Sequence, residues 1–185
     1  EKGFDLHMAG KFMATALVVG LLEEWIFRGL LLDALLRSSR ASIALLFVTF
    51  FFALVHFLKP PGTIDLNDAD VKLTTGFWMI GQIFIHFGNP VFIAAEFATL
   101  FAVGGVLGWA RLRTCSLWLS IGLHSGWVFS YELYRYHTFM PKRYSPELFL
   151  PYIGTNLKSG LIPLTTVCLT GVVIAIWLCL RNRRQ

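Results

Sequence analysis

Two neighbouring glutamates and an arginine interrupt an otherwise apolar segment near the start of the chain. Glu23, Glu24 and Arg28 lie within a run of Val, Leu, Ile and Phe residues between Val18 and Leu31. A charge at the centre of a membrane helix costs roughly 2.5–3.5 kcal/mol or more, so such groups normally face a partner or water. Glu24 and Arg28 are four residues apart and share a helix face, which predicts an ion pair between them. Glu23 points about 100° away from Glu24 on a regular helix, so its carboxylate stays available.

Further glutamate and histidine side chains lie in the later apolar runs. His56 follows Phe52-Ala53-Leu54-Val55, and both His124 and Glu96 lie in later runs. Burial in a low-dielectric pocket raises the pKa of a carboxylic acid, which suits it to act as a general base near neutral pH. A histidine beside it can share the proton or orient a water, and a second donor can stabilise the oxyanion that forms when water attacks an amide. One glutamate and two histidines therefore make a complete hydrolytic set without a Ser or Cys nucleophile.

The elements that must position these side chains are long apolar helices. The chain of 185 residues is 56% hydrophobic, whereas soluble domains are about 45–50% apolar. A helix needs about 20 mostly apolar residues to cross a bilayer. We therefore predict an all-α, polytopic transmembrane helix bundle with five spans, Ala9–Leu36, Ala41–Leu58, Pro90–Leu112, Cys115–Tyr136 and Leu161–Leu180. The apolar stretch Phe77–Phe87, which includes His86, is too short to cross and predicts one interfacial or re-entrant helix.

Basic residues gather at the ends of these runs. With five spans, the short loops Arg37–Arg40 and Arg111–Arg113 and the tail Arg181–Arg184 share one face, which the positive-inside rule places in the cytoplasm. The net charge of +5 therefore reflects membrane topology rather than nucleic-acid binding, for which no reader motif is present. Because the sequence starts at Glu1 without Met, we expect a single domain over residues 1–185 that lacks N-terminal helices.

Distances along the chain predict which of the ionisable groups meet. Glu23 and His56 lie 16 and 17 residues from the tight turn near Ser39, which is about 24–26 Å at the rise of an α-helix. Glu96 lies 17 residues from the next tight turn, but His124 lies only 11 residues from it, or about 16 Å if both helices start level. The counting therefore predicts a Glu23–His56 pair, with Glu96 at a matching depth and His124 nearer the Arg-rich face.

Small residues recur four apart on two of the predicted spans. Gly104 and Gly108 lie on one of them, and Gly122 and Gly126 lie on the next. Such pairs let helix backbones approach closely in membranes. We therefore predict that both pairs lie at helix–helix contacts.

Three ordered motifs carry a resemblance to a known family. They are Glu23-Glu24-x-x-x-Arg28, Phe52-x-x-x-His56 and His124 in the next-to-last span. The pattern resembles the CPBP/Abi family, which comprises CaaX prenyl proteases of the Rce type and bacteriocin-processing relatives. The resemblance covers roughly Gly20 to Tyr131.

This resemblance implies an intramembrane endopeptidase that works with an activated water. In that reading Glu23 or Glu24 is the base, His56 assists, and His124 helps to hold the oxyanion. Arg28 and Phe52 support the site, and no cofactor is required. The implied partners are the lipid bilayer and a membrane-associated peptide or protein substrate, prenylated or leader-bearing. We expect the location to be a bacterial inner membrane.

One position departs from the related pattern. The family usually has Asn or a similar polar residue four places after the last histidine, where this chain has Val128. The Val128 side chain cannot donate a hydrogen bond. Either Ser125, a backbone N–H or a residue elsewhere replaces that donor, or the oxyanion site is weakened.

Other functions stay open on the sequence alone. Glu23, His56 and His124 are also suitable zinc ligands, although the chain contains no HExxH motif. A non-catalytic membrane protein, such as a bacteriocin-immunity factor, scaffold or assembly partner, would carry the same charges as an ion-pair network. A transporter is less favoured because transporters often contain internal repeats, and none is visible here.

Overall fold

A computed structural model of the chain describes residues 5–56, 72, 74–85, 90–137, 152–153 and 160–183. Within these ranges the chain forms helices and turns and no strand, which confirms the all-α prediction for the described part. The helices are α1 (Leu6–Glu24), the π-helix η1 (Trp25–Leu31), α2 (Leu32–Leu36), α3 (Ala41–His56), α4 (Thr75–Ile85), α5 (Pro90–Thr114), α6 (Trp118–His137) and α7 (Leu161–Asn182).

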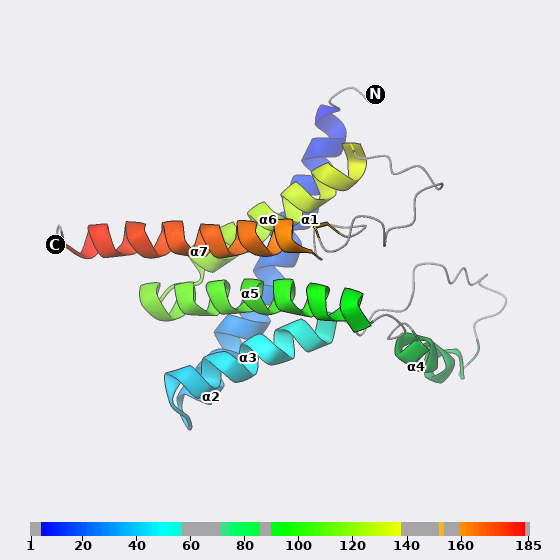
Figure 1. Ribbon diagram of the computed structural model, residues 1–185, viewed down its shortest axis with the longest axis horizontal. Coiled ribbons are helices and arrows are strands. Elements are labelled where there is room, and N and C mark those ends of the chain that lie inside the picture. The colour runs from blue at the N-terminus through cyan, green and yellow to red at the C-terminus, as the bar shows by residue number, and fades with distance from the viewer. Residues whose placement is uncertain are drawn as a thin grey trace.

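The helices pack as two groups that cross obliquely. Helices α1 and α6 lie side by side, and α5 lies between α3 and α7 (Figure 1). Helix α5 also contacts α6, so it joins the two groups. Helix α4 lies apart from the bundle (Figure 1). Side chains from α1, α3, α5 and α6 can therefore meet where the two groups cross.

Helices form most of the described part of each of the five predicted spans, although not all of them are typical membrane spans. Two stretches, Ile93–Thr114 and Leu161–Arg181, are long and apolar enough to cross a bilayer, whereas Ala41–His56 is apolar but shorter. Large apolar side chains such as Leu169 and Val173 of α7 are 64% exposed, as expected of a helix surface that faces lipid. The number of spans remains a prediction. The predicted interfacial segment carries α4, but His86 and most of the two long loops lie outside the described residues.

The first predicted span is not a regular α-helix. Directly after Glu24 the chain forms a π-helix over Trp25–Leu31, with the N–H of Leu32 bonded to the carbonyl of Phe27 five residues earlier. The wider turns keep Phe27 and Arg28 buried. They thus continue the buried stripe that Ala16, Gly20 and Glu24 form on α1. π-Helical segments are rare in proteins, and those that occur often lie at functional sites. The residues around this segment are therefore candidates for a functional site.

Close helix packing is confirmed for one glycine pair and is wrong for the other. A Cβ atom on Gly104 would lie 3.3 Å from the Cα atom of Thr49, and one on Gly108 would meet Leu45. Gly122 and Gly126 are exposed, and among the described residues a Cβ atom there would have no neighbour within 4 Å.

Helix α6 instead contacts α1 through Ile121 and Ser125. A Cβ atom on Gly20 of α1 would lie 3.3 Å from the Ile121 carbonyl oxygen and 3.1 Å from the Ser125 backbone nitrogen, and would also meet the Ser125 hydroxyl. The residues of α6 that meet α1 thus each precede a predicted glycine by one position, which places the contact face about 100° round the helix from the predicted one.

The substitution Gly20→Ala should separate α1 from α6. We expect it to lower the free energy of unfolding by about 1–3 kcal/mol, because the backbone atoms of α6 cannot move out of the way of the new methyl group. Thermal unfolding of the purified protein in detergent measures this loss. Gly126→Ala is the matched control, since its methyl group enters open space, and equal stability of the two variants would contradict the described packing.

Candidate functional site

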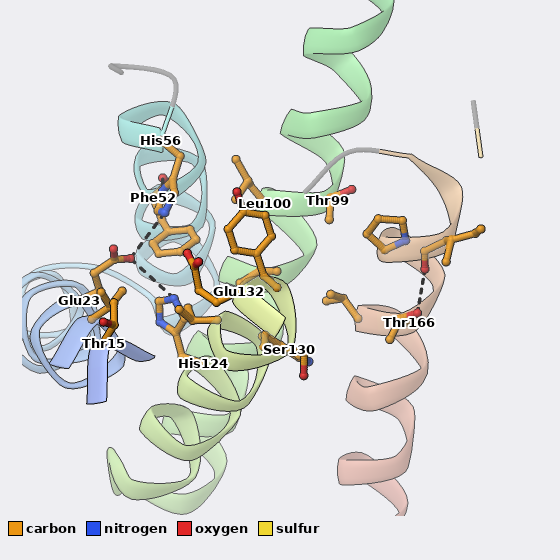
Figure 2. A pocket seen from close by; sticks show the side chains of 18 residues that line it. Thr15, Glu23, Phe52, His56, Thr99, Leu100, His124, Ser130, Glu132 and Thr166 are labelled. Carbon is orange, nitrogen blue, oxygen red and sulfur yellow. Dashed lines mark hydrogen bonds and ion pairs between the residues drawn. The ribbon is translucent and has the colours of Figure 1, made fainter. Parts of the chain in front are cut away.

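A cavity of about 380 Å³ opens where the two helix groups cross. Helices α1, α3, α5, α6 and α7 all contribute to its wall. Its polar lining includes Glu23 of α1, His56 of α3 and His124 of α6, and most of the other lining side chains are apolar. Figure 2 shows these three side chains turned toward one another from three different helices. The structure thus brings together the residues that the sequence singled out.

Glu23 is the meeting point of the two histidines. Its Oε2 atom lies 3.6 Å from Nε2 of His56 and 3.8 Å from Nε2 of His124. These separations are longer than a direct hydrogen bond, and Glu23 Oε2 makes none within the described part of the chain. The Glu23 side chain is 30% exposed. Oε2 itself is buried in the described structure, and a water molecule that reached it would also lie within reach of both imidazole nitrogens.

The other nitrogen of each imidazole is held by a fixed acceptor. Nδ1 of His56 lies 2.8 Å from the carbonyl oxygen of Phe52, which can only accept, so Nδ1 carries the proton. Nδ1 of His124 lies 2.8 Å from Oε1 of Glu24, and a carboxylate likewise accepts. The hydrogen bond at one imidazole nitrogen sets the role of the other. In their neutral forms both histidines therefore present an unprotonated Nε2 to Glu23.

A buried ion pair lies behind this cluster. Glu24 and Arg28 are both fully buried, and Nη1 of Arg28 donates to Oε1 of Glu24 at 2.7 Å. This confirms the ion pair that their spacing predicted. Nη2 of Arg28 also donates to the carbonyl oxygen of Gly104 on α5 at 3.1 Å. The contact between Glu24 and His124 was not predicted, and it gives Glu24 a second role, because Glu24 orients the histidine as well as pairing with Arg28.

Phe52 packs at the centre of the charged groups. Its ring lies 4.5 Å from the Arg28 guanidinium carbon, 4.4 Å from the His56 ring and 6.0 Å from the His124 ring. A cation over an aromatic face is attracted by the ring. Phe52 thus lies between Arg28 and the two imidazoles and contacts all three.

The predicted depth of His124 is wrong. Counting residues from the α5–α6 turn assumed that the two helices start level and run alongside each other. Helix α6 instead lies along α1 and runs obliquely to α5 (Figure 1). The oblique path carries His124 to Glu23, which lies at the depth of His56.

The remaining predicted polar residues lie outside the cavity wall. Ser125 is buried against Gly20 on the α1 side of α6 and does not line the cavity. Glu96 is half-buried on α5, one turn before the lining residues Thr99 and Leu100, and is not part of the lining. Val128 does line it, so Ser125 does not supply the polar side chain that the related pattern has at this place.

Two further ionisable residues line the cavity and were missed from the sequence. Tyr131 and Glu132 follow Val128 on α6, seven and eight residues after His124. These spacings put them on the same helix face as His124. That periodicity is the signal that could have found them.

The donor set does not match a metal site. Glu23 lies close to His56 and close to His124. Within the described ranges, however, no group of three or more His, Cys, Asp or Glu side chains has the arrangement of metal ligands. The suggested zinc set Glu23, His56 and His124 therefore does not fit this geometry.

Comparison with known families gives one match. The model of the Rce1-like family, described as type II CAAX prenyl endopeptidase Rce1-like, matches residues 6–130, which is more than half of the chain. The matched part contains α1, η1, α2, α3, α4, α5 and the first thirteen residues of α6. No curated protein and no solved structure matches the chain.

The substitution Arg28→Met should destabilise the whole bundle. It leaves the buried Glu24 carboxylate without its cation, which costs about 3–5 kcal/mol of unfolding free energy, and the double variant Arg28→Met, Glu24→Gln should recover a large part of that loss. Thermal unfolding in detergent measures both. The control is Arg111→Met, because the pair of Arg111 with Asp33 is partly exposed and is worth about 0–1 kcal/mol. A loss as small as that of the control would show that the buried pair is not important for stability.

Proposed function

Because the chain belongs to the Rce1-like family of type II CAAX prenyl endopeptidases, we propose that it is an intramembrane endopeptidase in which Glu23 activates the attacking water. The family is a protease family of membranes, and the apolar helices agree with that location. The observation that carries the proposal is the single carboxylate oxygen of Glu23 flanked by Nε2 atoms of two histidines.

The first chemical step uses Glu23 as the general base. A water held by its Oε2 atom loses a proton to the carboxylate as its oxygen attacks the carbonyl carbon of the scissile peptide bond. The partly apolar cavity strengthens this step, since charges interact more strongly where water is excluded. The proton on Glu23 then passes to the leaving nitrogen as the C–N bond breaks. General acid–base catalysis of this kind contributes about 10²–10⁴-fold to the rate.

The two histidines take different parts because their partners differ. His124 is oriented by the Glu24 carboxylate, and an Nε2–H group of this ring can donate to the developing oxyanion. His56 is held by a neutral carbonyl group, so its Nε2 is the better acceptor and orients the attacking water. Glu24 and Arg28 keep this arrangement in place and do not touch the substrate.

The substrate is a membrane-associated peptide or protein. Apolar side chains such as Leu100, Val103 and Val167 form much of the cavity wall, and they can hold an apolar segment next to Glu23. The proposal places the chain in the bilayer as a multi-pass protein of a bacterial inner membrane, with the Arg-rich turns in the cytoplasm.

The substitution Glu23→Gln tests the base. It removes the proton acceptor and keeps the shape, so it should lower kcat/KM by a factor of about 10²–10⁴. The assay follows cleavage of lipid-anchored peptides by mass spectrometry, with the full chain in proteoliposomes and thermal unfolding as the folding control. A variant with full activity would contradict the role of Glu23. A chelator should leave the rate of the native protein unchanged, and loss of activity together with stoichiometric zinc would reject the mechanism.

The substitution Val128→Asn tests the oxyanion contact. An amide donor on the cavity wall one turn after His124 should raise kcat, since an oxyanion donor is worth about 10²–10³-fold when it is well placed. Val128→Thr is the control. It keeps the branched shape of Val, and its hydroxyl group reaches less far into the cavity than the amide group of Asn, so it should raise kcat less. If neither variant changes kcat, the oxyanion does not form beside residue 128.

A further inference from the structure

The cavity contains a second carboxylate that the proposed mechanism does not use. Glu132 of α6 lines the cavity one turn after Val128. Figure 2 shows the side chain of Glu132 turned into the cavity rather than away from it. Glu23 already accepts the proton from water, and the two histidines already flank it. Glu132 therefore needs another explanation.

The fixed charges that face the cavity are of one sign. Glu23 and Glu132 are acidic, and no Lys or Arg occurs among the described lining residues. Arg28 is turned away, against Glu24. Arg135 attracts Glu132 but lies on the exposed side of α6, where water and salt screen its charge. A cleft with charges of one sign and low-dielectric walls concentrates counter-ions.

The wall provided by α7 is apolar. It presents Ile162, Pro163 and Val167, with the hydroxyl group of Thr166 between them. Lys and Arg side chains can lay their methylene stems on such a surface while the cationic head reaches a carboxylate. A substrate carboxylate would meet two like charges instead. The cavity therefore fits a long basic side chain better than a neutral or acidic one.

We infer that Glu132 selects substrates that carry a Lys or Arg side chain close to the scissile bond. The inference rests on the proposed function, because Glu23 must hold the water beside that bond. Glu132 binds the ammonium or guanidinium group, and α7 packs against its stem. Both lie after residue 130, where the family match ends.

Binding measurements with charged peptides test this selection directly. The full chain is placed in nanodiscs of uncharged phosphatidylcholine. The probes are fluorescent, N-acetylated and C-terminally amidated apolar peptides in which one Lys, Gln or Glu is moved along the sequence. We expect the best Lys peptide to bind about tenfold more tightly than its Gln counterpart, as for a charge-assisted hydrogen bond, and the Glu peptide to bind weakest.

Variants of Glu132 decide whether this residue causes the preference. Glu132→Gln should abolish it, and Glu132→Lys should reverse it in favour of the Glu peptide. Asp5→Asn is the matched control. It removes one negative charge at the exposed N-cap of α1, where Asn caps a helix as well as Asp, and it should keep the Lys preference. Equal binding of the three peptides, or a Lys preference that survives both Glu132 variants, would overturn the inference.

Cleavage of the same peptides separates this inference from the proposed protease activity. A Glu132-dependent Lys preference in binding without any cleavage supports the cation site and refutes the protease. Cleavage that ignores the charge of the peptide and of residue 132 refutes the cation site and supports the protease.

Discussion

The buried contact between Glu24 and Arg28 is the interaction on which the rest of the site depends. Two opposite charges in one fully buried pair are stable only when both are matched and hydrogen-bonded. Arg28 supplies the cation, the carbonyl group of Gly104 accepts from its other nitrogen, and His124 shares the same carboxylate oxygen. The pair therefore ties the first helix to α5 and α6. Phe52 adds α3 through its ring over the guanidinium group.

In the proposed mechanism, this rigid support leaves one group available for chemistry. The neighbouring residues Glu23 and Glu24 differ in their surroundings, because Glu24 faces the protein interior and Glu23 faces the cavity. Oε1 of Glu24 is bonded to Arg28 and His124, whereas among the described residues Glu23 Oε2 is approached by the more distant imidazole nitrogens without a hydrogen bond. Each imidazole is turned by a contact behind it, so that both reactive nitrogens point at the same carboxylate. A catalytic geometry of this kind requires that the supporting groups do not move.

The sequence predicts the parts of this site that depend on local spacing. The spacing of four residues predicted the Glu24–Arg28 ion pair. The similar distances of Glu23 and His56 from one tight turn predicted that these two residues lie close together. The position of His124 could not be predicted because it depends on the angle between α6 and α5. The glycine pair on α6 failed for a related reason, since the side of a helix that meets a neighbour is decided by tertiary packing. Glu132 could have been found from the periodicity of α6, but only once His124 was known to face the cavity.

The π-helix that follows the glutamates has a consequence for how this helix can change. An α-helix turns by about 100° per residue, so a single insertion or deletion would normally rotate everything on one side of it away from its neighbours. A stretch of wider turns over Trp25–Leu31 holds one more residue per hydrogen-bonded ring than an α-helix does. The π stretch therefore determines how far Glu23 and Glu24 are rotated about the helix axis relative to the Arg-rich turn that follows α2. Shortening this stretch by one residue would return it to an ordinary helix and leave the two glutamates close to their present orientation toward α3 and α6, because the wider turns already accommodate the additional residue. This segment is thus the place where the first helix can gain or lose one residue without turning the glutamates away from the histidines.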